Sequence, residues 1–213
     1  MRYIYVVDTE TTTTEWHSEK YNGAPDGHIV EIGIVLLDLR HGTVRPQYWF
    51  TFNDPDATGL EWVYQNTDLP LRDSFRKTWK EVDDSLDEMV RYSPIEDHGM
   101  IPITAFNVDF DKTMIERDLP KFSKHLYWCM DIMKSADKIE EIPRKVHDLS
   151  TGWRSYPSVQ STWDYLFPDD PQIEKHRALD DAIQEAKICR ALWIRDLFYY
   201  FTPEEDDYEH RYL

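Results

Sequence analysis

The chain of 213 residues is poor in cysteine and glycine, with only two and seven of them. The two cysteines, Cys129 and Cys189, cannot build a disulfide framework and do not form a pair of zinc ligands. So few glycines leave no glycine-rich loop of the kind that cradles phosphate groups. The residues also suggest no zinc signature and no Ser/His/Asp triad. A reducing, cytoplasmic setting therefore fits this sequence better than secretion does.

Long hydrophobic runs are missing as well. The apolar run Ile4–Val7 is too short for a signal-peptide core or a membrane span, so we expect a soluble protein without membrane association. A hydrophobic fraction of 41% is nevertheless enough to fill a core. The length suits a single domain. We place this domain at residues 1–202 and an acidic tail at residues 203–213.

Positive charge is scarce, because 24 Lys and Arg residues face 41 Asp and Glu residues, for a net charge of −17. Five of the acidic residues and one arginine lie in the tail, so most of the excess belongs to the domain. Nucleic-acid-binding proteins usually carry a basic surface, and a chain this acidic repels a phosphate backbone at long range. The charge therefore favours weak or terminus-only binding, but it does not argue against catalysis.

Hydrophobic patterning predicts alternating strands and helices. Apolar, β-branched runs predict strands at Tyr3–Thr9, Ile29–Leu37, Gln47–Phe52, Ile101–Phe106 and Leu126–Met130. Helical spacing of apolar residues, or a flanking proline, predicts helices at 75–90, Asp109–Asp118, Ser158–Leu166 and Ala178–Phe201. The segment Trp16–Gly27 is predicted to be a loop, and Lys134–Ser155 a loop with a little helix. Three strands in sequence, then helices alternating with strands, indicate an α/β domain whose mixed sheet starts antiparallel.

Two carboxylates stand at the end of the first predicted strand. Asp8 and Glu10 are two residues apart, so they project from the same face of the strand. Placing two unpaired carboxylates side by side in a buried strand costs several kcal/mol, on the order of the penalty for burying charges. A divalent cation removes that cost by neutralising both charges. The alternative is that Asp8 merely ends the strand and Glu10 is solvated.

Further candidates follow later elements. Asp111 lies at the start of a helix after the apolar strand Ile101–Phe106, at a sheet edge where α/β proteins usually bind ligands. An acidic residue there is often only a helix cap. His176 precedes the last helix, and Asp181 lies in its first turns with a small residue, Ala182, beside it. A lone histidine before a helix is usually a surface residue, so the order of the motifs carries more information than any one of them.

Taken together, the motifs resemble those of the DnaQ-like (DEDDh) 3′–5′ exonucleases. That family has Asp-x-Glu-Thr in its first strand, then Asn, two residues and Phe-Asp, and finally His, four residues and Asp-Ala. The chain has the same order of residues, namely Asp8, Glu10, Thr11, Asn107, Phe110, Asp111, His176, Asp181 and Ala182. The resemblance spans roughly residues 3–195. It implies a ribonuclease H-like fold, with a mixed sheet flanked by helices.

The resemblance also implies a mechanism. Asp8, Glu10, Asp111 and Asp181 would hold two divalent cations, Mg²⁺ or Mn²⁺, which favour hard oxygen ligands. His176 would be the general base, since an imidazole with a pKa of about 6.5 suits proton transfer near neutral pH. The implied product is a nucleoside 5′-monophosphate from the 3′ end of DNA, with single strands the expected substrate.

Substrate contacts are expected beside these ligands, at Thr9, Thr11, Asn107 and Phe110. A phenylalanine can stack on any base, although core packing of Phe110 is the more common outcome. The chain departs from the family pattern in three places, one of which is a first loop, up to His28, that is longer than in compact members. No glycine follows the first motif closely, and Phe106 stands where the family often has histidine.

Three alternatives remain open. The same motifs occur in exoribonucleases, so the substrate could be the 3′ end of RNA. The chain could instead act mainly as a proofreading or adaptor subunit of a replication or repair complex, docking through the aromatic residues Trp193, Phe198, Tyr199, Tyr200 and Phe201. A catalytically silent mimic of nucleic acid would explain the negative charge but would not need this set of metal-ligand candidates.

Overall fold

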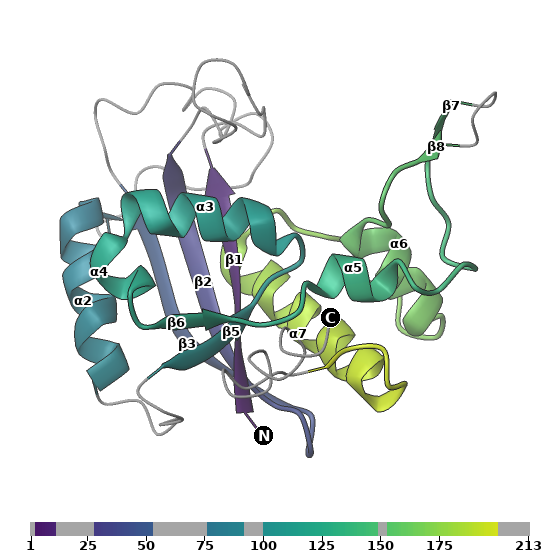
Figure 1. Cartoon of the computed structure of the whole chain (residues 1–213), viewed down its shortest axis with the longest axis horizontal. Helices are drawn as coiled ribbons and strands as arrows, with labels where there is room; N and C mark the ends of the chain where they lie inside the picture. The colour runs from purple at the N-terminus through teal and green to yellow at the C-terminus, as the bar shows by residue number, and fades with distance from the viewer. Residues whose placement is uncertain (1–2, 12–27, 53–75, 92–99, 149–152, 200–213) are drawn as a thin grey trace, which may run out of the picture.

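The computed structural model describes residues 3–11, 28–52, 76–91, 100–148 and 153–199, and the expected loop Trp16–Gly27 and the acidic tail lie outside these ranges. Its centre is a six-stranded sheet in the order β4-β3-β2-β1-β5-β6 (Figure 1). The strands are β1 (Tyr3–Thr11), β2 (Ile29–Asp38), β3 (Thr43–Phe52), β4 (Arg76–Lys77), β5 (Ile101–Thr104) and β6 (Leu126–Trp128).

The sheet is mixed. β1, β2 and β3 pair antiparallel, as the order of the first three predicted strands indicated. β5 and β6 then continue the sheet in parallel with β1, and the short β4 adds in parallel beyond β3. The first predicted strand continues to Thr11, so Glu10 lies within β1 and not beyond it.

Helices cover both faces of the sheet. One face packs against α2 (Trp79–Arg91), α3 (Val108–Asp118) and α4 (Pro120–Ser123), and the other against α5 (Ile132–Ala136), α6 (Val159–Leu166) and α7 (Ala178–Ile194). In Figure 1, α3 crosses in front of the sheet and α7 runs behind β1. Ile4 and Val6 of β1 belong to the core under α7, while Tyr5 and Val7 belong to the core on the opposite face. Burial on both faces explains why the strand reads as a continuous apolar run.

Several predicted boundaries are corrected. β3 begins at Thr43, and it accommodates Pro46 at a register shift in its pairing with β2. β5 ends at Thr104 because the chain turns soon afterwards, where Asn107 has a φ of 85°. The poorly patterned segment after residue 134 contains the end of α5 and a separate two-stranded sheet, β7 (Val146–Asp148) and β8 (Trp153–Arg154).

The prediction that the last helix continues to Phe201 is wrong, since α7 ends at Ile194. The helix ends because Asp196 adopts a φ of 56° and the amide of Leu197 turns back to donate to the carbonyl of Leu192 at 3.0 Å. Phe198 then returns to the core, where it is only 1% exposed. Phe198 is therefore not part of an exposed docking surface, and Tyr200 and Phe201 lie outside the described residues.

Both cysteines are free and buried. Among the helices that the structure describes, none has the length and apolarity needed to cross a bilayer.

Candidate active site

Asp8 and Glu10 project from β1 toward the face of the sheet that α7 covers. They continue the alternation of Ile4 and Val6, which pack in the core beneath that helix. Opposite them in β2 stand Gly33, paired with Asp8, and Glu31, paired with Glu10. The two carboxylates are partly buried, so each can reach a ligand at this end of the sheet.

The head of α7 lies unusually close to the sheet because Gly33 has no side chain. A Cβ atom at Gly33 would lie 2.4 Å from the backbone of Ala178 and Leu179. Beside this contact the fully buried carboxylate of Glu31 accepts hydrogen bonds from Arg177 and from the backbone N–H of Ala178 at 3.0 Å. A glycine and a buried acid in β2 therefore fix the first turn of α7 over the carboxylates of β1.

Asp181 lies in that first turn and is 4% exposed. Its carboxylate accepts hydrogen bonds from the backbone N–H groups of Lys175, at 3.3 Å, and Arg177, at 3.0 Å. These two hydrogen bonds hold the segment before α7 against the first turn of the helix. His176 lies between the two donor residues and has a positive φ of 54°. The strained turn directs the His176 ring outward, where its side chain is 57% exposed.

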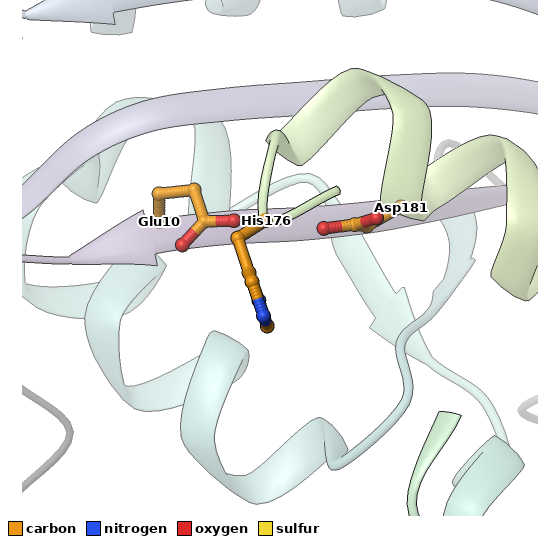
Figure 2. Close-up of side chains that lie close together, drawn as sticks. All are labelled: Glu10, His176 and Asp181. Atoms are coloured by element: carbon orange, nitrogen blue, oxygen red, sulfur yellow. The ribbon is translucent and has the colours of Figure 1, made fainter. Parts of the chain in front are cut away.

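Glu10, His176 and Asp181 come together at this point. Each offers one ligand atom, and these atoms all lie within 4.8 Å of one another. The carboxylates of Glu10 and Asp181 face each other, and the His176 ring extends from between them (Figure 2). His176 also lies 3.9 Å from the carboxylate of Glu174, measured from its Nδ1 atom.

Asp111 approaches from α3 on the other side of β1. It is 3% exposed, and its carboxylate accepts a hydrogen bond of 2.7 Å from the hydroxyl of Thr9. Thr9 therefore positions a carboxylate, whereas the sequence predicted a substrate contact for it. Thr11 is also buried, and Phe110 packs in part on the core beneath α2 and α3.

Two further carboxylates hold the turn that leads to Asp111. The backbone N–H of Phe106 donates to Glu185 at 3.1 Å, and those of Asn107 and Val108 donate to the two oxygens of Asp131 at 3.2 and 3.0 Å. The left-handed conformation of Asn107 makes this run of donors possible. Asn107, expected to touch substrate, thus has its backbone N–H committed to Asp131.

The carboxylates raise one another's pKa. Burial is the largest cause at each of them, and mutual repulsion adds to it at Asp8 and Glu10. The pKa of Glu10 rises to about 8. That of Asp111 rises to about 7, although the hydrogen bond from Thr9 opposes the shift. The pKa of Asp181 is also raised by burial, against the effect of its two backbone donors.

Such a cluster needs either protons or cations to be stable near neutral pH. Its donors are carboxylate oxygens with one imidazole beside them, which suits Mg²⁺ or Mn²⁺ better than a thiolate-seeking metal. The structure therefore brings the ligand atoms of Glu10, His176 and Asp181 within 4.8 Å of one another. Asp8 and Asp111 do not belong to that group, but Asp8 is close enough for Glu10, Asp111 and Asp181 to raise its pKa. The chemistry of these residues fits a divalent cation.

Sequence reasoning missed four acids of this region, namely the supporting residues Glu31 and Asp131, and also Glu174 and Glu185. Glu185 is 2% exposed, and burial raises its pKa well above the ordinary value. Its spacing of four residues from Asp181 places both on one helix face, a signal that the sequence contained. Glu174, whose pKa is also raised by burial, lies two residues before His176 and had no comparable signal.

Several solved structures with the same fold are nucleases. The nuclease domain of 3′hExo, a DEDDh family member bound to rAMP, superposes with a TM-score of 0.65 at 15% identity, covering 94% of this chain and 96% of that one. Cell-death related nuclease 4 gives a TM-score of 0.63 at 15% identity over 92% of this chain and 64% of that one. Exonuclease I of E. coli, in complex with a dA16 oligonucleotide, gives a TM-score of 0.55 at 14% identity, covering 93% of this chain and 42% of that one.

No protein-family model matches the chain, and no curated protein matches its sequence. The structural likeness nevertheless covers 94% of this chain. It confirms the fold that the sequence motifs implied: the chain has the ribonuclease H-like architecture of the DEDDh 3′-exonucleases.

Proposed function

We propose that this protein is a metal-dependent 3′–5′ exonuclease that releases nucleoside 5′-monophosphates from the 3′ end of single-stranded DNA. One observation carries the proposal, namely the meeting of Glu10, His176 and Asp181 with their ligand atoms within 4.8 Å. Asp8 and Asp111 belong to the same region, because Asp111 and Asp181 each help to raise the pKa of both Asp8 and Glu10 by charge repulsion. The order and elements of these residues are those of the DEDDh motifs.

Each residue has a distinct part in the proposed reaction. Asp8, Glu10, Asp111 and Asp181 would hold two Mg²⁺ or Mn²⁺ ions, which would supply Lewis acidity to the phosphodiester and to the attacking water. His176 accepts the proton of that water. Its exposed ring suits this part because the proton must afterwards pass to solvent.

The negative charge of the chain shapes the substrate range. A net charge of −17 disfavours long contacts with a phosphate backbone. The protein therefore binds mainly the terminal nucleotides, and its affinity comes from the cations and from close contacts near the 3′ end. Phe110, only partly buried, is available for a contact with a base.

RNA is the second candidate substrate. Two structures with this fold are described as a 3′-exonuclease that recognises the histone mRNA stem-loop and as a nuclease domain bound to rAMP. The carboxylate site is compatible with either nucleic acid, because its residues would hold cations that act on the phosphodiester, which DNA and RNA share. Two buried, free cysteines are compatible with the cytoplasmic location that we propose for the activity.

The test uses 5′-labelled single-stranded DNA and the matching RNA, each incubated with Mg²⁺, with Mn²⁺ or with chelator. We expect a metal-dependent ladder that shortens from the 3′ end. Asp181→Asn should abolish it, and His176→Ala should slow it by about 10²–10⁴, the range typical of a general base.

Asp180→Asn is the matched control, because Asp180 is an exposed neighbour of Asp181 that pairs with Lys175 at 3.1 Å. It should retain the wild-type rate. Absence of cleavage with every metal would refute the exonuclease proposal and favour a protein that acts through partners. If all three variants cleaved at the wild-type rate, the protein would still be an exonuclease, but Asp181 and His176 would not be its catalytic residues.

A further inference from the structure

A second cleft lies at the other end of α7, away from the carboxylates. It encloses about 400 Å³ between α6, the C-terminal half of α7 and the turn between β2 and β3 at Gly42. Its lining includes three cations, Lys187, Arg190 and Arg195, and one acid, Asp170. Lys187 follows Asp181 by six residues, so the first cation stands ~9 Å further along the helix axis. The cleft is therefore separate from the proposed catalytic site.

Among the residues that the structure describes, all three cations of the cleft lack an acidic partner, as a few other basic residues such as Lys124 also do. Acidic residues outnumber basic ones by 41 to 24, so a lysine or arginine readily finds a carboxylate. Eight other basic residues do so among the described residues, for example Lys80 with Asp84 and Lys175 with Asp180. Within the same part of the chain, no ion pair is formed by Lys187, Arg190 or Arg195.

Each cation is instead held by an uncharged neighbour. The ammonium of Lys187 lies 5.4 Å from the centre of the Trp163 ring, a cation–π contact. Arg195 donates from Nη1 to the carbonyl of Ala191 at 3.0 Å. Arg190 packs directly over Gly42, where a Cβ atom would lie 2.4 Å from its Nε. All three side chains are thus held in place by groups that do not neutralise their positive charge.

Arg190 also has an unmet hydrogen-bonding requirement. Its Nε atom is buried and finds no acceptor among the described residues. A buried donor without an acceptor costs about 1–3 kcal/mol. Arg190 also lines the cleft, so an anion there could offer its guanidinium group charge-assisted hydrogen bonds. Apolar side chains complete the wall, with Leu166 buried, Phe167 partly buried and Ile194 55% exposed.

We propose that this cleft binds a small phosphomonoester, a phosphate group carried on an apolar or aromatic body. Arg190, Arg195 and Lys187 would take the phosphate, since two guanidinium forks and an ammonium match a doubly charged anion better than a single carboxylate does. Phe167 and Ile194 would take the body. A volume of about 400 Å³ suits a molecule of mononucleotide size.

Binding is tested by calorimetry on the full chain in the presence of EDTA, which keeps divalent cations away from the carboxylates. AMP is the probe, and adenosine and inorganic phosphate are its two halves. We expect AMP to bind at least about tenfold more tightly than either half, and added salt to weaken it. Lys187→Gln and Arg190→Gln should each lower the affinity for AMP by about tenfold or more, the usual effect of a lost charged hydrogen bond.

Lys124→Gln is the matched control, because Lys124 is exposed and forms no ion pair among the described residues. It should leave AMP binding unchanged. The indole N–H of Trp163, which donates to the carbonyl of Asp170 at 2.7 Å, gives an independent NMR signal that should move on binding. The proposal is overturned if AMP does not bind with EDTA, if phosphate alone binds equally well, or if the control weakens binding as the cleft variants do. Since no step requires catalysis, the result stands apart from the exonuclease assay.

Discussion

The guanidinium group of Arg177 holds the buried carboxylate of Glu31, with Nη2 3.0 Å from Oε1 and Nε 3.2 Å from the same oxygen. Glu31 lies within the fully buried strand β2, and 146 residues separate it from its partner. The same carboxylate accepts the backbone N–H of Ala178, the first residue of α7. This contact therefore joins the centre of the sheet to the helix that carries Asp181.

Arg177→Met should lower the free energy of unfolding by about 3–5 kcal/mol, because it leaves the Glu31 charge buried without its partner. Glu31→Gln combined with Arg177→Met should recover part of that loss, since the buried charge is gone. Urea denaturation of the single and double variants measures both effects. A single variant within about 0.5 kcal/mol of the wild type, the range of ordinary surface substitutions, would show that the pair contributes little.

Gly33→Ala should displace the head of α7 from the sheet. The added Cβ would meet the backbone of Ala178 at 2.4 Å, and a backbone cannot move aside as a flexible side chain does. Overpacking of this kind costs about 1–3 kcal/mol. It should also weaken Mn²⁺ binding, because Asp181 moves with the helix relative to Glu10. Denaturation measures the loss of stability, and calorimetric titration measures the loss of Mn²⁺ affinity. A variant with wild-type stability and wild-type Mn²⁺ affinity would exclude the close contact.

The central elements could be predicted because local patterning and burial agree there. β1 and β2 are apolar on both faces, and α6 begins where Ser158 caps it with a reciprocal pair of hydrogen bonds to Ser161. The end of α7 could not be predicted, because no glycine or proline marks it. Asp196 takes the left-handed conformation only because the chain must bring Phe198 back to the core.

The ligands of the proposed site were found from motif order and not from physical pattern. Asp111 and Asp181 each looked like ordinary acids of a first helical turn, and only the fold shows that both are buried. The supporting contacts were out of reach of sequence reasoning. The link from Glu185 to Phe106 spans 79 residues, and no local rule connects an acid within a helix to a backbone N–H in a distant turn.

Divalent cations should stabilise the protein more strongly as pH rises. The pKa of Asp111 is raised from 3.8 to about 7 and that of Glu10 from 4.5 to about 8. A raised pKa in the folded state favours folding when the group is protonated, below its ordinary pKa, and this stability is lost as pH rises through the folded value. Without metal, the melting temperature should therefore fall between about pH 5 and pH 8.

Mg²⁺ or Mn²⁺ should reverse that fall, because cations replace the lost protons. A saturating cation at about 100 times its Kd adds about 2.7 kcal/mol, which corresponds to roughly 5–10 °C for a chain of this size. Melting curves with metal and with chelator at each pH give the comparison, and Asp181→Asn should lose most of the metal effect. A metal effect that is larger at pH 5 than at pH 8 would contradict the assignment of these carboxylates as ligands.

Glu185 should be replaceable by glutamine but not by leucine. Its carboxyl is fully enclosed, burial raises its pKa, and it accepts the N–H of Phe106 that opens the turn toward Asp111. Glu185→Gln keeps an acceptor for that N–H and removes a charge that repels Asp8, so stability at pH 8 should equal or exceed that of the wild type. Glu185→Leu leaves the N–H buried without a partner, at a cost of about 1–3 kcal/mol.

The two variants also separate positioning from mere packing. If Glu185 positions the turn, Glu185→Leu should raise the Mn²⁺ concentration needed for half-maximal exonuclease rate severalfold, while Glu185→Gln stays close to the wild type. Glu116→Gln, an exposed acid of α3 that lies 3.8 Å from Lys112, controls for the loss of one negative charge. If Glu185→Gln lost as much metal affinity as Glu185→Leu, the carboxylate of Glu185 would itself be a metal ligand. Metal binding would then depend on the charge of Glu185 and not on its hydrogen bond to Phe106.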